Sequence, residues 1–401
     1  MRENNGYKFN IPSYVDLIMS RLDSCGESVY IVGGSLRDML MGREPHDFDL
    51  AVSAEPARVC EIFSDMRVIK TGIAHGTVTV ISEGHPVEIT TFRVDGDYLD
   101  MRRPESVSFT RRIEDDLARR DFTVNAMAYN GRDGLIDLFS GLSDLNSGII
   151  RTVGDPRERF SEDALRMMRA LRFSAQLGFE IERGTFEAIS LLSESLGRIA
   201  RERIFSELLR LICSPSPVRA LELFNESGVA ERVLSCRVED FAIALVPLVE
   251  SDDISRLSAL LCYLDRERAR DILTSLKASG RQRAVVCAVI DASKRSYLGR
   301  EDVARLRGSL GADAKIALRL SVLLGRSEES ILAFADDNTP CSIKELAIGG
   351  EDIIALGYGG KEIGRALAFL LDAVIRDPSL NTRERLLSLL RTREEIWKDL
   401  T

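Results

Sequence analysis

The hydrophobic periodicity of this chain changes between about residues 140 and 155. Before that point, short runs rich in Val, Ile and Thr predict buried strands. The expected strands are 29–32, 48–52, 77–81 and 87–92, and a short helix is expected over 35–41. After that point apolar residues recur at helical spacing, as in 164–177, 203–212 and 365–375. The pattern therefore predicts an α/β head followed by an all-helical remainder.

The length and composition indicate several folded domains. The chain has 401 residues, of which 45% are hydrophobic and 29% charged, so it can bury more than one core. At about 150 residues per domain, two to four domains are expected. Pro- and Ser-rich residues 215–217 and the loop at 338–340 are the expected joints.

Some protein classes are disfavoured by the same sequence. No apolar run approaches the roughly 20 residues of a membrane helix, and the N-terminus lacks the layout of a signal peptide. The seven cysteines include no C-x-x-C pair, so we expect reduced thiols in a cytoplasmic protein. The net charge of -9 argues against nonspecific coating of nucleic acid, although it leaves room for a local basic groove.

Residues that follow the first predicted strand carry the chemistry. Gly33 and Gly34 join that strand to a helix, where exposed backbone N–H groups favour a phosphate. Arg37 adds a bidentate cation one turn later. Asp47 and Asp49 form D-x-D, and on a strand the side-chain period of two projects both carboxylates from one face. Paired carboxylates suit Mg²⁺, so we expect a magnesium site there.

Each of these signals has a simpler interpretation when taken alone. A lone D-x-D is typical of a solvated loop, and most Gly-Gly pairs are ordinary turns. Their order, with Arg37 between them, favours the catalytic interpretation. His46 and Asp47 also spell the H-D pair of a metal-dependent phosphohydrolase. That class needs further His ligands downstream, and the chain has no His beyond residue 85.

The motif resembles that of a known family. The class II tRNA nucleotidyltransferases (CCA-adding enzymes) and the related bacterial poly(A) polymerases share the pattern G-G-x-x-R-D-x-L-x-G-x-x-x-x-D-x-D-L, which is matched here by Gly33, Gly34, Arg37, Asp38, Leu40, Gly42, Asp47, Asp49 and Leu50. Segments similar to later family motifs follow in order at 116–126, 137–145, 162–173, 201–208 and 346–375. The resemblance covers nearly the full length.

This resemblance implies a domain plan. A nucleotidyltransferase-fold head with a mixed β-sheet would cover 1–150. An all-α neck that recognises the nucleotide base would cover 151–212, and a helical body would cover 213–340. A helical tail that binds tRNA would cover 341–401.

The resemblance also implies roles for individual residues. Asp47 and Asp49 would hold two Mg²⁺ ions, one that activates the attacking hydroxyl and one that stabilises the leaving group. Glu88 would be a further acidic catalytic position, although a strand carboxylate is also typical of an exposed edge. The residues that would bind the nucleotide are Gly33, Gly34, Arg37, Arg120, Asp121, Asp163, Arg166, Arg169 and Arg172. The helix expected at 162–173, which would carry the last four of these residues, also has a simpler interpretation. It could be an amphipathic helix with solvated Arg on its outer face.

Base choice without a nucleic-acid template has a physical basis in two of these residues. Cytosine and adenine both present an amino donor beside a ring-nitrogen acceptor, whereas uracil and guanine present the reverse. A carboxylate only accepts and a guanidinium only donates. Asp163 with Arg166 would therefore match C and A and fail U and G.

The expected function is addition of CMP and AMP from CTP and ATP to the 3′ end of tRNA, with release of pyrophosphate. Partial enzymes that add only A or only CC stay open, although the intact stretch 93–116 argues against the shortened loop of CC-adding relatives. A poly(A) polymerase would be expected to carry a basic C-terminal extension. A non-catalytic RNA-binding relative would be expected to lack D-x-D. The sequence leaves monomer and homodimer equally open.

Overall fold

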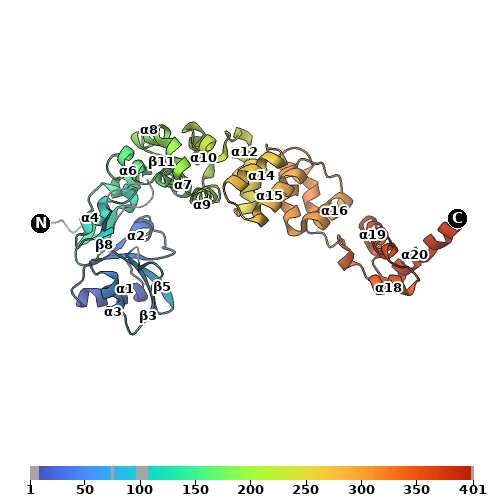
Figure 1. Cartoon of the computed structure of the whole chain (residues 1–401), viewed down its shortest axis with the longest axis horizontal. Coiled ribbons are helices and arrows are strands. Elements are labelled where there is room, and N and C mark those ends of the chain that lie inside the picture. Colours follow the sequence, from blue (N-terminus) through green and yellow to red (C-terminus); the bar gives the residue numbers. More distant parts are fainter. Residues whose placement is uncertain (1–8, 74–75, 96–106, 399–401) are drawn as a thin grey trace. The chain divides into compact units, whose positions relative to one another are not determined.

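The computed structural model describes residues 9–73, 76–95 and 107–398. His75 and most of the loop within 93–116 lie outside these residues. The chain divides into two compact units, Met1–Arg237 and Val238–Thr401, coloured blue to green and yellow to red in Figure 1. The finer boundaries expected at 150, 212 and 340 stay predictions.

The first unit begins with a seven-stranded mixed sheet in the order β3-β4-β5-β2-β1-β8-β9. Its strands are β1 (Val29–Val32), β2 (Asp49–Val52), β3 (Arg67–Ile69), β4 (Thr77–Ser82), β5 (His85–Thr91), β8 (Met127–Asn130) and β9 (Gly134–Asp137). Strands β2 and β5 run parallel, and the other neighbours in this order run antiparallel. All four expected strands are present, with ends shifted by one or two residues.

Short helices and hairpins complete the head. They are α1 (Ser13–Ser24), α2 (Gly33–Leu40), α3 (Pro56–Ile62), α4 (Ile113–Ala118), α5 (Gly141–Ser147) and the hairpin of β6 (Arg93–Asp95) and β7 (Val107–Phe109). Strand β1 is buried along its whole length, as its continuous apolar run requires. Tyr30 and Val32, two residues apart, share one core cluster with Phe92 and Leu117.

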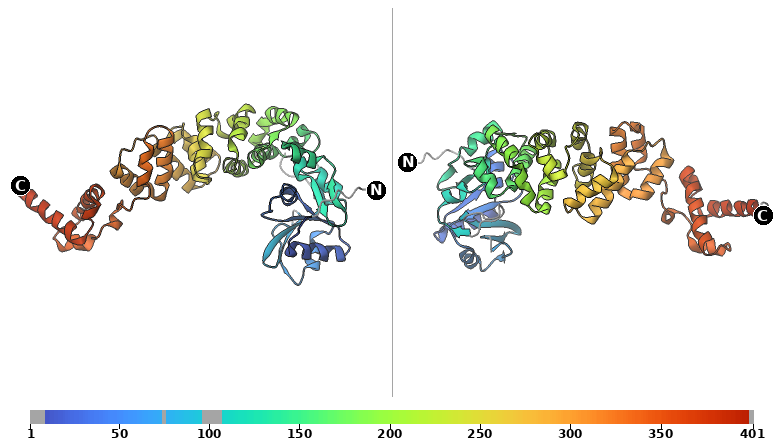
Figure 2. Two further views of the ribbon diagram at one scale, coloured as in Figure 1. Left: turned by 180° about the vertical axis from the view of Figure 1, so that it is seen from behind. Right: turned by 45° about the horizontal axis from the view of Figure 1, so that its top comes forward.

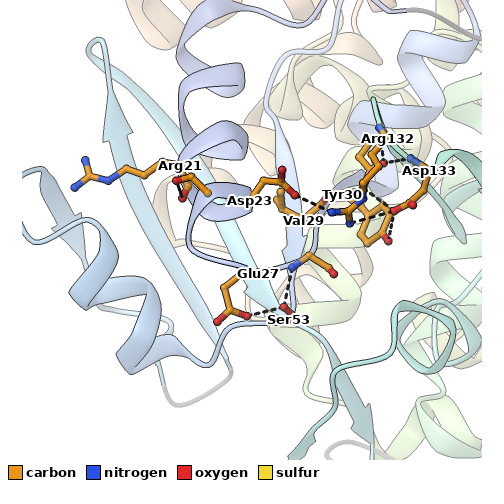
Figure 3. A network of polar contacts seen from close by, with 11 residues as sticks. Arg21, Asp23, Glu27, Val29, Tyr30, Ser53, Arg132 and Asp133 are labelled. Carbon is orange, nitrogen blue, oxygen red and sulfur yellow. Dashed lines mark hydrogen bonds and ion pairs between the residues drawn. The ribbon is translucent and has the colours of Figure 1, made fainter.

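A polar network fixes the end of the sheet where β1 begins (Figure 3). The Ser53 hydroxyl donates to the Glu27 carboxylate at 2.7 Å, and the Tyr30 hydroxyl donates to Asp133 at 2.8 Å. Burial and this hydrogen bond raise the pKa of Tyr30 to about 12, so the phenol stays protonated. The network anchors the start of β1, and the last residue of β1 is followed directly by Gly33.

Helices follow the head, as both views of Figure 2 show. In the first unit they are α6 (Pro156–Glu162), α7 (Leu165–Leu177), α8 (Arg183–Leu192), α9 (Arg201–Ile212), α10 (Pro217–Glu226) and α11 (Val229–Leu234). Helix α7 packs against α9 and α10, and most of its residues are buried. The two-residue strands β10 (Ile149–Ile150) and β11 (Glu180–Ile181) pair within this otherwise helical region.

The described part of the second unit is helical. Its helices are α12 (Asp240–Leu245), α13 (Asp253–Leu261), α14 (Arg266–Ser275), α15 (Gly280–Ser293), α16 (Arg300–Leu310), α17 (Ala314–Leu323), α18 (Gly350–Ala355), α19 (Lys361–Arg376) and α20 (Arg383–Lys398). The last three share a hydrophobic cluster centred on Ile353, Leu370 and Leu386. Among the described residues, no helix combines the length and apolarity needed to cross a bilayer.

Candidate active site

The end of β1 and the start of α2 form one corner of the site. Gly33 has φ +67°, which a residue with a side chain rarely adopts. A Cβ there would lie 3.2 Å from an Arg120 guanidinium nitrogen and 3.6 Å from an Asp49 carboxylate oxygen. The Asp49 backbone N–H donates to the Ser35 hydroxyl at 3.3 Å, which ties β2 to the first turn of α2. The glycine therefore lets the backbone approach both charged groups closely.

Two carboxylates, those of Asp49 and Glu88, lie on neighbouring strands at this corner, and Asp47 is near enough to act on Asp49 through its charge. Asp49 opens β2, and its register partner on the parallel strand β5 is Glu88. Burial raises the pKa of Asp49, the negative charges of Glu88 and Asp47 raise it further, and Arg120 opposes them. Asp47 is exposed and lies in a bend two residues before β2 begins at Asp49, so the expectation that both D-x-D residues lie on a strand is wrong for Asp47. The ladder reaches only Phe48, whose carbonyl accepts from the Glu88 N–H at 3.3 Å.

A cleft of about 840 Å³ extends from these carboxylates to α7 and α9. Of the predicted site residues, those that line it are Gly33, Gly34, Arg37, Asp49, Glu88, Arg120, Asp121, Asp163, Arg166, Arg169 and Arg172. Asp47 lies outside this lining but close enough to act on the charge of Asp49. Residues that are distant in sequence are thus brought into one cavity, acidic at the sheet and rich in Arg toward the helices.

The arginines next to the sheet are held by a buried carboxylate. Asp116 on α4 is 1% exposed and accepts hydrogen bonds from both Arg119 and Arg120, at 2.8 Å and 3.0 Å for the closest nitrogens. Burial alone would raise the pKa of Asp116, but Arg120 and Arg119 together hold it below the usual value. Asp116 therefore stays ionised and fixes both guanidinium groups at the cleft wall.

A chain of hydrogen bonds through Asn125 and Asp121 connects α2 of the head to helix α7. Arg169 donates to the Asp121 carboxylate with two nitrogens, at 2.8 and 2.5 Å. Burial opposes ionisation of Asp121, yet Arg169 and Asn125 keep the pKa of this carboxyl low. Arg37, itself buried, donates to the Asn125 side-chain oxygen at 2.8 Å. Three of the predicted nucleotide-binding residues, Arg37, Asp121 and Arg169, are thus joined in one network.

The predicted base-reading residues meet partners that the sequence interpretation did not include. Asp163 accepts from the Leu165 N–H and from Arg203 of α9, both at 3.0 Å. Arg166 donates to the Arg159 carbonyl at 2.9 Å and forms an ion pair with Glu162. Asp163 and Arg166 both line the cleft.

Helix α9 contributes a polar stripe that sequence reasoning missed. Arg203, Ser206, Glu207 and Arg210 follow the i, i+3, i+4, i+7 spacing of one helix face, and all four line the cleft. Glu207 is buried and forms an ion pair with Arg172 at 2.9 Å. This spacing is visible in the sequence and is the signal that could have identified them.

Helix α7 does not present its arginines to bulk solvent. Arg166 is 8% exposed and Arg172 is 9% exposed. Burial lowers the pKa of Arg172 to about 10, although the Glu207 charge opposes that shift. The interpretation of this helix as a solvated amphipathic face is therefore wrong for Arg166 and Arg172.

The acidic corner suits a hard divalent cation. Within the described residues, no three His, Cys, Asp or Glu side chains are close enough to form a complete metal-binding cluster. Asp49 is nevertheless a partly buried carboxylate whose negative neighbours oppose its ionisation, and a cation would remove that opposition. The donor set of Asp47, Asp49 and Glu88 is all oxygen, which such ions prefer.

Comparison with known proteins identifies the class. Residues 29–151 match the poly(A) polymerase head domain, and residues 178–236 match a probable RNA- and SrmB-binding site of polymerase A. The first match spans β1 to β10 and includes Gly33, Asp49, Glu88 and Arg120. The head is therefore a nucleotidyltransferase domain of the poly(A) polymerase type.

Relatives that align over nearly the full length of the chain identify the family within this class. The CCA-adding enzyme of Pediococcus pentosaceus is 35% identical, covering 95% of this chain and 97% of that protein. That of Limosilactobacillus fermentum is 37% identical, covering 92% and 94%. The structure of the Bacillus stearothermophilus CCA-adding enzyme in complex with CTP superposes with a TM-score of 0.80 at 31% identity, covering 95% and 98%. The chain belongs to the family of CCA-adding enzymes, which confirms the family resemblance and the expected fold class.

Proposed function

We propose that this chain adds CMP and AMP, taken from CTP and ATP, to the 3′ end of tRNA and releases pyrophosphate. The observation that carries the proposal is the single cleft with carboxylates at the sheet and arginines on α7 and α9. Nucleotidyl transfer needs both features, because a triphosphate must be bound and charge on the reacting oxygens must be stabilised. The similar enzyme of Bacillus stearothermophilus has been solved with CTP.

Asp49 and Asp47 would hold Mg²⁺, with Glu88 beside them. When bound, Mg²⁺ lowers the pKa of the attacking hydroxyl and stabilises charge on the leaving group. Asp49 enters the site on a strand fixed by pairing on both sides, so its carboxylate is held in place. Asp47 is exposed in the bend just before that strand, where its carboxylate is accessible to an ion.

The residues that would bind the triphosphate and the ribose have separate roles in this proposal. Gly33 and Gly34 leave the first turn of α2 open to phosphate oxygens, and Arg37 lies behind that turn. Arg120 faces Asp49 and would neutralise charge at the reacting phosphate. Asp121 would bind the ribose, and its pairing with Arg169 keeps it ionised.

Asp163 and Arg166 would read the base. Asp163 uses one oxygen for the Leu165 N–H and the other for Arg203, but a carboxylate has about four acceptor positions and can accept a further bond. Arg203 therefore orients the Asp163 carboxylate rather than occupying it fully. Arg169 and Arg172 would support this end of the cleft.

We propose that the second unit contributes to tRNA binding, and that its last helices, α18 to α20, form the tail that does so. These helices have their own hydrophobic cluster, so they form a distinct element of that unit. We also propose a cytoplasmic location, since no disulfide joins any of the seven cysteines, all of which lie in described residues.

The test is incubation with tRNAs that end before CCA, after CC and after CCA, with each nucleotide alone and in combination. We expect two C and then one A to be added to the first, one A to the second and nothing to the third. Addition of A alone or of C alone would identify a partial enzyme. Long A tracts would identify a poly(A) polymerase.

A further inference from the structure

Three guanidinium groups of the cleft converge on one aromatic ring. The Cζ atoms of Arg172, Arg169 and Arg37 lie 4.1, 5.3 and 5.5 Å from the centroid of the Phe173 ring. All four side chains line the same cavity. Each distance is within the roughly 6 Å over which a cation is attracted to an aromatic ring.

The ring connects two parts of the site. Phe173 lies on α7 beside Arg169 and Arg172, whereas Arg37 comes from α2 of the head. Phe173 is 6% exposed. Besides the arginines, its ring contacts the ring of Phe122 edge-on, at 5.7 Å between the ring centroids. The ring is therefore held in place by packing and cannot turn away from the cations.

These cations repel one another before a substrate arrives. Each has a carboxylate partner of its own: Asp38 for Arg37, Asp121 for Arg169 and Glu207 for Arg172. Burial lowers the pKa of Arg172, and the charges of Arg169 and Arg210 lower it further, which shows how crowded the positive charge is. The negative face of an aromatic ring offsets part of such crowding without consuming a hydrogen-bond donor.

We propose that Phe173 is a positioning residue for nucleotide binding, which holds Arg37, Arg169 and Arg172 together at the cleft wall by cation–π contact. This inference rests on the proposed function, because the ligand it serves is a nucleoside triphosphate. A carboxylate at this position would also gather the cations, but it would compete with the phosphates for them. A neutral ring gathers them and leaves their charge available.

The test compares CTP binding by calorimetry and CMP incorporation for wild type, Phe173→Leu and Phe173→3,4,5-trifluorophenylalanine. The leucine variant removes the ring, and the fluorinated variant keeps its shape but weakens its negative face. We expect Phe173→Leu to raise the Kd and KM for CTP about five- to thirtyfold, with kcat changed much less. The fluorinated variant should give a smaller rise in the same direction.

Phe224→Leu is the matched control. Phe224 lies on α10, which packs against α7, and it is fully buried away from the cleft lining. It should lose thermal stability but keep the Kd for CTP. Wild-type affinity in the fluorinated variant, or an equal loss of affinity in Phe224→Leu, would overturn the inference. Wild-type protein that binds CTP but does not extend tRNA would instead contradict the proposed function and leave this comparison valid.

Discussion

Asp49 on β2 and Glu88 on β5 are direct register partners on two parallel strands, so two carboxylates lie side by side on interior strands of the head sheet, where β2 begins. Like charges in this position oppose each other, and burial of Asp49 increases the effect. An arrangement that is unfavourable without a cation becomes favourable once a cation binds. We therefore regard this pair, with Asp47 beside it, as the centre of the predicted metal site.

Asp49→Asn and Asp47→Asn should each abolish nucleotide addition. We expect a loss of more than about a hundredfold, since even residues that merely orient a metal ligand are worth roughly 10- to 100-fold. Thermal stability should be unchanged or slightly higher in Asp49→Asn, because a buried charge is removed. Initial rates in Mg²⁺ and melting curves would test this, and near wild-type turnover in either variant would refute the metal assignment.

The pKa of Asp49 should depend on Glu88. In the metal-free protein the Asp49 carboxyl should titrate above the usual value of about 3.9, because its ionised form is buried and repelled. Glu88→Gln removes one of the negative charges, so the pKa of Asp49 should fall toward that value. Carbon NMR of the labelled Asp49 carboxyl across a pH series measures this pKa in wild type and in Glu88→Gln. An identical pKa in the two proteins would show that Glu88 does not act on Asp49.

Asp116 should stabilise the fold in a pH-dependent way. Its pKa is lower in the folded protein than in the unfolded chain, so the stabilisation is present above about pH 3.9 and is lost as the pH falls through the lower, folded value. Asp116→Asn leaves Arg119 and Arg120 without this anion and should cost about 3 kcal/mol at pH 7. Melting temperatures should differ most between pH 5 and 7 and converge in acid. A difference in melting temperature between wild type and Asp116→Asn that stays constant down to pH 2 would contradict the role of ionised Asp116 in stability.

The sequence was sufficient for some parts of this site and not for others. Period-two and helical patterns predicted the strands that carry Asp49 and Glu88 and the helix that carries Arg166. The register that makes Asp49 and Glu88 partners depends on pairing between residues 39 positions apart in the chain (88 − 49), which no local pattern encodes. Likewise, Arg203 and Glu207 face Asp163 and Arg172 only because α7 packs on α9. The D-x-D pattern placed Asp47 on the strand, but the ladder ends at Phe48.

Removal of residues 342–401 should weaken tRNA binding far more than CTP binding. The nucleotide cleft is lined by residues between 32 and 210, and the last helices carry a separate hydrophobic cluster. Filter binding of tRNA and calorimetry with CTP, on the full chain and the truncated chain, would compare the two affinities. A folded, truncated protein with unchanged affinity for tRNA would refute the proposed role of the tail.

The central claim is that protein side chains, without a template, choose the nucleotide. Asp163→Ala removes the acceptor for the amino group of the base, and Arg166→Ala removes the donor to its ring nitrogen. Each leaves a polar edge unmatched, at about 1–3 kcal/mol, or roughly tenfold to a hundredfold in discrimination. Arg157→Ala, an exposed arginine of α6 outside the cleft lining, is the matched control and should keep wild-type selectivity.

The decisive measurement is single-nucleotide incorporation by these proteins, with CTP against UTP on tRNA lacking CCA and with ATP against GTP on tRNA ending in CC. We predict that wild type and Arg157→Ala strongly prefer CTP and ATP. Asp163→Ala and Arg166→Ala should lose much of that preference, beyond any uniform slowing. If the preference survives both substitutions unchanged, the base is read elsewhere and the account of this cleft is contradicted.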